Sequence, residues 1–280
     1  MRENARVAFD TEPKQWFDHW ARSGLSREPV ETVTLVASAA IRGDMSLDLS
    51  GALRTMDMLA GDAPTNAGDL VRYLARQHGY GREQVAYDDP DSSFIDTALT
   101  KRRGLPLSLS IIAIGVAARV GVDLRGIGLP GHFIVRDAAT DTLFDPYHGG
   151  RIVDLDDCEA MFTSIHGHHA VWDSKRHLVE VDTTAAVERM LANLRHAGIA
   201  NHSPEITYRA VACQMSLPGT DHRLALTTAP ALAETGRLDL AADLLERAAD
   251  VLDRTEDDSP TTDASSELRS RARMLRARLN

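Results

Sequence analysis

The spacing of apolar residues changes twice along this chain, from a helical period to a period near two and back again. Residues 31–42 carry apolar side chains at three- and four-residue intervals, which predicts an amphipathic helix. Residues 124–137 and 142–153 tend towards alternation, which predicts short strands joined by a turn at residues 138–142. The helical period then returns towards the C-terminus. This order favours an α+β fold with an antiparallel sheet over a repeated βαβ array.

The same changes of period divide the chain into three expected sections. These are a helical N-terminal region at residues 1–86, an α+β core at 87–182 and a helical tail at 183–280. The longest apolar run, Leu105–Ala118, falls in the core. It is shorter than the roughly 18 residues that a membrane span needs, so it predicts a buried helix. Pro106 suits the first turn of that helix, where its missing N–H costs nothing.

The composition excludes several classes of partner. The chain has 41 acidic and 31 basic residues, which gives a formal net charge of −10. Such a chain repels a phosphate backbone, so we expect no nucleic-acid partner. The first 16 residues contain no apolar stretch of the kind found in a secretory signal. Cys158 and Cys213 have neither metal spacing nor a disulfide-rich context. We therefore expect a cytoplasmic protein without a membrane partner, whose cysteines are small core residues.

The predicted hairpin carries the most informative polar residues. If its turn is centred between residues 139 and 140, His132 lies opposite Tyr147, and Ile134 lies opposite Asp145. His132 and Asp145 are then diagonal neighbours about 7–8 Å apart at the backbone, which is within side-chain reach. A carboxylate that orients an imidazole is half of a nucleophilic triad. A histidine–aspartate pair of this kind is also common as a purely structural contact.

The third member of a triad would be a nucleophile at the start of the buried helix. Backbone N–H groups and the helix dipole stabilise an anion there. Ser108 is the candidate at that place, and its simpler interpretation is a first-turn serine that bonds backbone N–H groups.

Other polar groups give weaker signals. His166, His168 and His169, with His148 upstream, are residue types that bind zinc or nickel. Their spacing lacks a helical i, i+4 pair, so we interpret them as a polar loop and expect no metal or cofactor. Five arginines mark the last helix, which we interpret as a solvated capping helix because no aromatic residues are interleaved for stacking.

Several sequence blocks are similar to those of a known family. The core blocks are RRGLPLSLS at residues 102–110, PGHF at 130–133 and FDPYHGG at 144–150. The tail blocks are VERMLANLR at 187–195 and TGRLDLAADLLERAADVL at 235–252. Together they resemble the bacterial SirB-type transglutaminase-like proteins, over most of the chain from about residue 30.

The resemblance implies a papain-like core followed by a tetratricopeptide-like helical tail. It puts His132 and Asp145 on the positions of the family fold's histidine and aspartate. Where catalytic relatives carry cysteine, this sequence has Pro106–Ser108, with the register nearer to Pro106.

Two functional hypotheses follow from these residues. The first is a degenerate transglutaminase-like protein, a pseudoenzyme that binds a polypeptide or regulates one through its core cleft or its tail. Arg102, Arg103 and Tyr147 are the candidate contacts with that polypeptide, although two adjacent arginines are also common as a solvated pair. The second hypothesis is an amide or isopeptide hydrolase, or an acyl transferase. It uses Ser108 as nucleophile, His132 as base and Asp145 as the orienting carboxylate.

Overall fold

The computed structural model describes residues 13–43, 47–81, 83, 85–255 and 262–279. The N-terminal section contains helices α1 Pro13–Ser23, α2 Val30–Arg42, α3 Leu49–Gly61 and α4 Ala67–Arg76, with a short 3-10 helix Leu25–Arg27. The middle section contains the 3-10 helix Pro90–Ser92, helices α5 Ile95–Lys101 and α6 Pro106–Arg119, strands β1 Leu124–Ile127, β2 Ile134–Asp137, β3 Leu143–Asp145 and β4 Arg151–Val153, and helices α7 Leu155–His166 and α8 Ser174–His177. The tail contains α9 Thr183–Ala200, α10 Pro204–Gln214, α11 Arg223–Glu234, α12 Leu238–Thr255 and α13 Thr262–Ala277.

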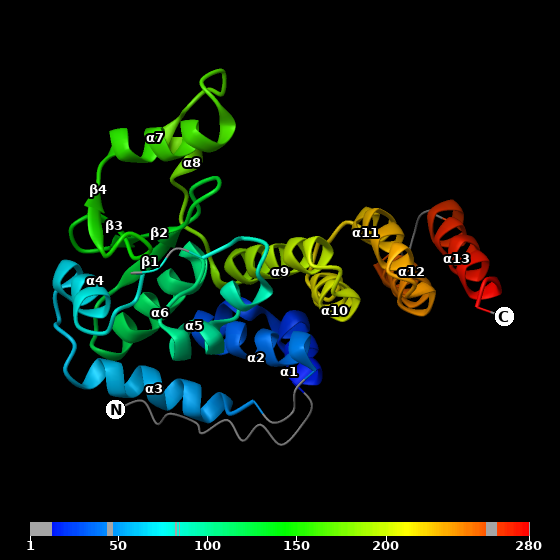
Figure 1. Cartoon of the computed structure of the whole chain (residues 1–280), viewed down its shortest axis with the longest axis horizontal. Coiled ribbons are helices and arrows are strands. Elements are labelled where there is room, and N and C mark those ends of the chain that lie inside the picture. Colours follow the sequence, from blue (N-terminus) through cyan, green and yellow to red (C-terminus); the bar gives the residue numbers. More distant parts are fainter. Residues whose placement is uncertain (1–12, 44–46, 82, 84, 256–261, 280) are drawn as a thin grey trace.

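This order of elements confirms the α+β fold predicted from the hydrophobic period (Figure 1). The four strands form one antiparallel sheet in the order β1-β2-β3-β4. Each of the two extended segments predicted from the sequence is in fact divided into two strands. The breaks fall at Gly128–Phe133 and Pro146–Gly150, where glycine and proline interrupt the extended backbone.

The register of the central hairpin agrees with the prediction. Val135 of β2 pairs with Phe144 of β3, and Arg136 pairs with Leu143. Both pairs centre the turn between residues 139 and 140. Continuing the same count beyond the paired residues sets His132 opposite Tyr147 at one end of the sheet.

Helix α6 forms the centre of the fold. Pro106 occupies its first turn, and 11 of its residues are buried, so the predicted buried helix is confirmed. It packs against β1 and β2 on one side and against α2, α3, α4 and α5 on others. Among the described residues, no helix has both the length and the apolar character needed to cross a membrane.

One large hydrophobic cluster joins all three expected sections. It includes Val36 of α2, Ile112 of α6 and Leu191 of α9, all at most 1% exposed. The N-terminal helices and the first tail helix therefore pack on the same core as the sheet. The division of the chain into domains at residues 1–86, 87–182 and 183–280 stays a prediction.

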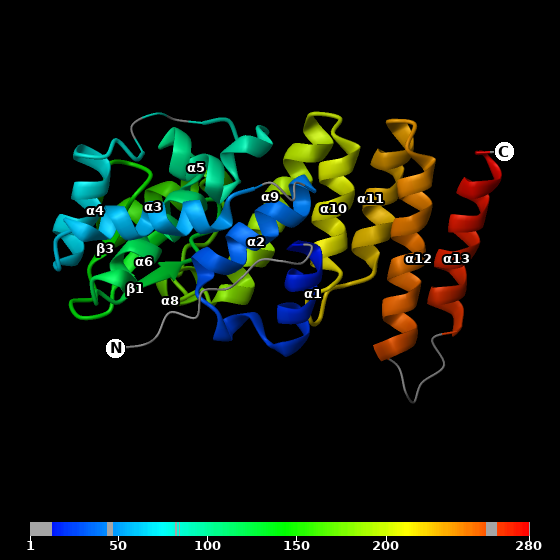
Figure 2. The ribbon, with the colours of Figure 1, turned by 90° about the horizontal axis from the view of Figure 1, so that it is seen from below.

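The tail is a row of neighbouring helices that leads away from the sheet (Figure 2). Its helix pair around Gly236 is confirmed, because α11 ends just before this glycine, α12 begins just after it, and the two helices pack together. Gly236 has φ of 80°, a conformation that glycine adopts without strain. Helix α13 covers α12: Arg269 pairs with Asp250 and Asp253, and Arg276 pairs with Glu246. These contacts agree with the interpretation of α13 as a capping helix.

The seam between α11 and α12 gives a first testable prediction. Ala241 is fully buried in a cluster with Ala229 and Leu232. Ala241→Phe is expected to overpack this seam and to lower the free energy of unfolding by about 1–3 kcal/mol, measured by thermal or urea denaturation. Glu234→Phe, at an exposed position of α11, is the control. An Ala241→Phe variant as stable as the control would contradict the pairing.

Candidate functional site

Two tight turns at one end of the sheet bring the polar residues of the hairpin together. His132 follows a turn in which its own N–H donates to the carbonyl of Leu129, at 2.9 Å. Asp145 ends β3, and the N–H of Gly150 donates back to its carbonyl at 2.8 Å. Asp145 is fully buried, and His132 is 7% exposed.

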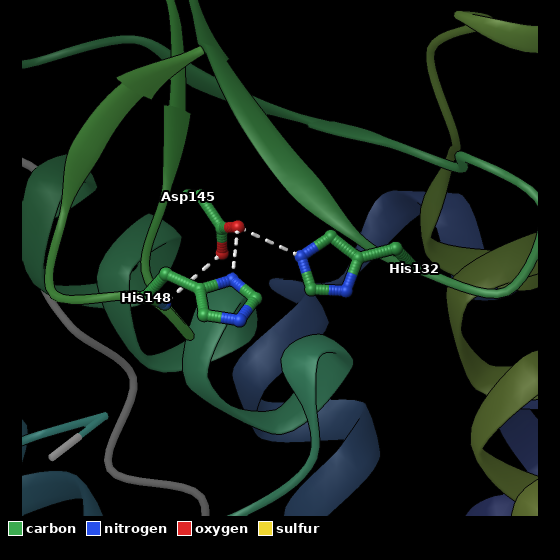
Figure 3. Close-up of side chains that lie close together, drawn as sticks. All are labelled: His132, Asp145 and His148. Carbon is green, nitrogen blue, oxygen red and sulfur yellow. Dashed lines mark hydrogen bonds and ion pairs between the residues drawn. The ribbon is translucent and has the colours of Figure 1, made fainter. Parts of the chain in front are cut away.

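The Asp145 carboxylate is the centre of the site (Figure 3). Its Oδ2 lies 2.9 Å from Nε2 of His132 and 2.6 Å from Nδ1 of His148. Its Oδ1 accepts the backbone N–H groups of Tyr147 and His148, at 3.0 and 3.2 Å. Burial alone would raise the pKa of Asp145, but the hydrogen bonds and charges of the two histidines hold that pKa below its ordinary value. The carboxylate is therefore ionised at neutral pH, and both ring nitrogens donate to it.

The segment before His132 is held from two sides. Arg189 of α9 donates to the carbonyl of His132 at 2.9 Å and to the carbonyl of Leu129 at 3.2 Å. Tyr87 donates its hydroxyl to the carbonyl of Gly131 at 3.3 Å. The imidazole of His132 is therefore fixed through its backbone as well as through Nε2, which leaves Nδ1 as the nitrogen not bonded to Asp145.

Ser108 is committed to a different contact. Its hydroxyl lies 3.3 Å from the carbonyl of Ser92 and 3.2 Å from that of Ser93, and the residue is 1% exposed. The expectation that Ser108 bonds backbone N–H groups of its own helix turn is corrected, because it donates to carbonyls of the preceding 3-10 turn. A role for Ser108 in a triad with His132 and Asp145 stays a prediction.

The three candidate contacts for a polypeptide lie in different surroundings. Tyr147 belongs to the site: its ring centroid is 5.9 Å from that of His132, and its hydroxyl accepts the N–H of Val85 at 3.4 Å. Arg103 instead forms an ion pair with Glu83 at 2.9 Å. Arg102 caps the C-terminus of α5 with φ of 57°.

Neither cysteine supplies a reactive thiol. Cys158 of α7 and Cys213 of α10 are both fully buried and unpaired, which confirms them as core residues. Burial raises the pKa of Cys158 to about 11 and that of Cys213 to about 12. Both are therefore protonated thiols at neutral pH, and a thiol is a far weaker nucleophile than a thiolate.

The sequence interpretation missed His148 as a partner of Asp145. It grouped this residue with the downstream histidines, whereas in the structure His166 ends α7 and packs against Phe162, with ring centroids 4.7 Å apart. The signal that could have found His148 is its position three residues after Asp145, in a turn marked by two glycines. In the described residues, His132, Asp145 and His148 are the one group whose donor atoms lie close enough to hold a metal ion.

A groove of about 550 Å³ adjoins this site through Arg189. It is lined by Ala185, Glu188, Arg189, Ala192 and Arg195 of α9, and by Gln214, Gly219, Thr220, Asp221 and Leu224. Gln214 is 5% exposed. Within the described part of the chain, its Oε1 and the Nε of Arg195 are buried without a hydrogen-bond partner. Both residues line the groove, so an acceptor and a donor without a partner lie buried beneath its surface.

Comparisons with known proteins find similarity in the part of the chain that contains the sheet and the site. Residues 48–192 match the model of the transglutaminase-like superfamily. A UPF0162 protein of Xylella fastidiosa is 38% identical over 96 residues, covering 34% of each chain. A UPF0162 protein of Pseudomonas aeruginosa is 28% identical over 142 residues, covering 51% of this chain and 52% of the relative.

A more distant relative is F-box only protein 21 of Mus musculus, which is 26% identical over 141 residues, covering 46% of this chain and 21% of the relative. The aligned part thus spans about a third to a half of the length of the bacterial relatives. No solved structure matches the chain significantly. Because the matched region spans α3 to α9 and includes the whole sheet, the chain belongs to the transglutaminase-like superfamily.

Proposed function

We propose that this chain is a SirB-type, non-catalytic transglutaminase-like module that binds an extended polypeptide segment in the groove beside α9. The first support is the chemistry around His132. Nδ1 of His132 is the nitrogen that a thiol would face in a catalytic relative, but both thiols of this chain are buried and protonated. The hydroxyl of Ser108 already donates to two carbonyls.

The observation that carries the proposal is the buried, unpaired Oε1 of Gln214 together with the unpaired Nε of Arg195. Leaving a buried polar group without a partner costs about 1–3 kcal/mol, so a partner that bonds both groups gains affinity. An extended peptide offers N–H donors and C=O acceptors along its whole length. Both atoms lie beneath the groove surface, so a bound segment pairs with them once the side chains of Gln214 and Arg195 turn towards it.

The groove lies within the tail, and one of its lining residues contacts the core. Arg189 lines it and donates to the carbonyl of His132, so a bound segment would contact the side chain that holds the backbone of His132. We assign α9–α10 and α11–α12 to tetratricopeptide-like helix pairs, with α13 as the cap. Stacked helix pairs build extended surfaces that suit polypeptides. Two buried, unpaired cysteines fit a reducing compartment, and we place the protein in the cytoplasm.

The test is selection of peptides from a random phage-displayed library on the immobilised full chain. Enriched peptides are expected, and Gln214→Leu is expected to weaken their binding at least tenfold. The same substitution is expected to leave the melting temperature unchanged or higher, because it removes an unpaired buried acceptor. Arg271→Ala, at an exposed position of α13, is the control and should bind normally. No enrichment, or equal binding by Gln214→Leu and the control, would overturn the proposal.

A further inference from the structure

His132, Asp145 and His148 converge in a way that a structural hydrogen bond alone does not require. Two imidazole nitrogens from different turns approach one carboxylate oxygen, and the three donor atoms lie within 4.8 Å of one another. Figure 3 shows the two rings on neighbouring sides of Oδ2 of Asp145, with His132 in the segment that leads into β2 and His148 in the turn after β3. The same oxygen is the common point of both contacts.

These donor types and separations suit a borderline divalent metal. Zinc binds imidazole nitrogen and carboxylate oxygen at about 2.0–2.2 Å, which keeps neighbouring donors of a tetrahedron roughly 3–3.5 Å apart. Oδ2 lies 2.9 and 2.6 Å from the two nitrogens. To reach the spacing of zinc ligands, each imidazole moves away from the carboxylate by a few tenths of an ångström to about 1 Å. Two histidines and one carboxylate are also the protein ligands of several open metal sites.

The surroundings already orient the carboxylate as they do around bound metals. Oδ1 of Asp145 is held by the N–H groups of Tyr147 and His148, so Oδ2 is the oxygen left to the two imidazoles. Outer hydrogen bonds of this kind fix the direction of a ligating carboxylate. Arg189 fixes the backbone of His132 through its carbonyl. The fold therefore positions the three ligands before any metal binds, so metal binding requires little further ordering of the side chains.

We infer that His132 Nε2, Asp145 Oδ2 and His148 Nδ1 form a binding site for one divalent transition metal ion, of which Zn²⁺ fits best. The ion takes the place of the two protons that now lie between the nitrogens and Oδ2. The proton on each ligating nitrogen moves to the other nitrogen of the same ring, or to water where that nitrogen already carries a proton, so no oxidant or further reactant is needed. The side chain of His148 is 42% exposed, which provides an entry path and leaves a fourth position for water or a ligand.

This inference goes beyond the polypeptide-binding proposal and does not rest on it, because the three ligands are distinct from the residues that line the groove. The test uses the full chain, freed of metal by chelator and dialysis. Titration with Zn²⁺ by calorimetry is expected to give one ion per chain. Titration with Co²⁺ is expected to give the visible absorption of a tetrahedral or five-coordinate site. Absence of that Co²⁺ absorption would overturn the inference.

His148→Gln is the decisive variant, because its side chain is 42% exposed and the glutamine amide is still able to donate to Asp145. It is expected to weaken Zn²⁺ binding at least tenfold, measured at a temperature at which the melting curve of the metal-free variant shows it to be fully folded. His169→Gln, at an exposed position outside the site, is the matched control and should bind Zn²⁺ normally. Equal Zn²⁺ affinity of His148→Gln and the unmodified chain would overturn the inference. Weaker Zn²⁺ binding by His169→Gln, to the same degree as by His148→Gln, would assign the ion to the downstream histidines and would overturn it as well. Asp145→Asn should weaken binding in the same direction as His148→Gln, and unchanged affinity in it would also count against the site.

Discussion

Asp145→Ala is expected to lower the free energy of unfolding by about 3–5 kcal/mol, the range for breaking a buried charge network by removing one partner. The carboxylate is fully buried and accepts four hydrogen bonds, two from imidazoles and two from backbone N–H groups. Its removal leaves the buried ring nitrogen of His132 and the part-buried N–H groups of the turn without an acceptor. Urea denaturation of the variant and the unmodified chain measures the difference.

The control for Asp145 is Asp156→Ala, which removes an exposed carboxylate from the first turn of α7. It is expected to change stability by less than about 1 kcal/mol. An Asp145→Ala variant that loses no more stability than Asp156→Ala would contradict the network described for this site.

Gly150→Ala is expected to destabilise the fold by about 2–5 kcal/mol, because backbone strain and a steric clash act together. Gly150 has φ of 73°, and a Cβ added there would lie 2.9 Å from the backbone carbon and oxygen of Val71. Neither α4 nor the turn can move without disturbing the core beneath them. Thermal denaturation and the yield of folded protein both measure this effect.

The neighbouring glycine supplies a matched control. Gly149 has φ of 74°, almost the same as Gly150, but a Cβ added there meets nothing within 4 Å. Gly149→Ala is therefore expected to cost only the strain of the left-handed conformation, about 1 kcal/mol. Equal losses in the two variants would contradict the close approach of this turn to α4.

Local patterns were sufficient to predict the register of the hairpin. The turn residues between β2 and β3 and the alternation on either side fix which residues face one another. The contact between His132 and Asp145 follows from that register. The helix 31–42 and the helix pair around Gly236 were also predicted correctly. Their hydrophobic period and the glycines that end them lie within the segments themselves.

Contacts that depend on distant segments were not predictable in this way. Ser108 bonds carbonyls of residues 15 and 16 positions earlier, and nothing in its own helix specifies that packing. His148 lies outside the paired strands, in a turn where alternation gives no direction for a side chain. The groove depends on how α9 packs against the segment that joins α10 to α11, so its unused donor and acceptor have no sequence signature.

If His132 and Asp145 serve no nucleophile, a serine-reactive phosphonate leaves the protein unlabelled. The full chain is incubated with the probe and analysed by intact mass, with His132→Ala treated alongside. We expect no labelling of Ser108, together with a loss of about 1–3 kcal/mol in the free energy of unfolding of His132→Ala, because a buried carboxylate loses one of its donors. Labelling of Ser108 that His132→Ala abolishes, with its melting temperature nearly unchanged, would contradict the account and establish a working triad.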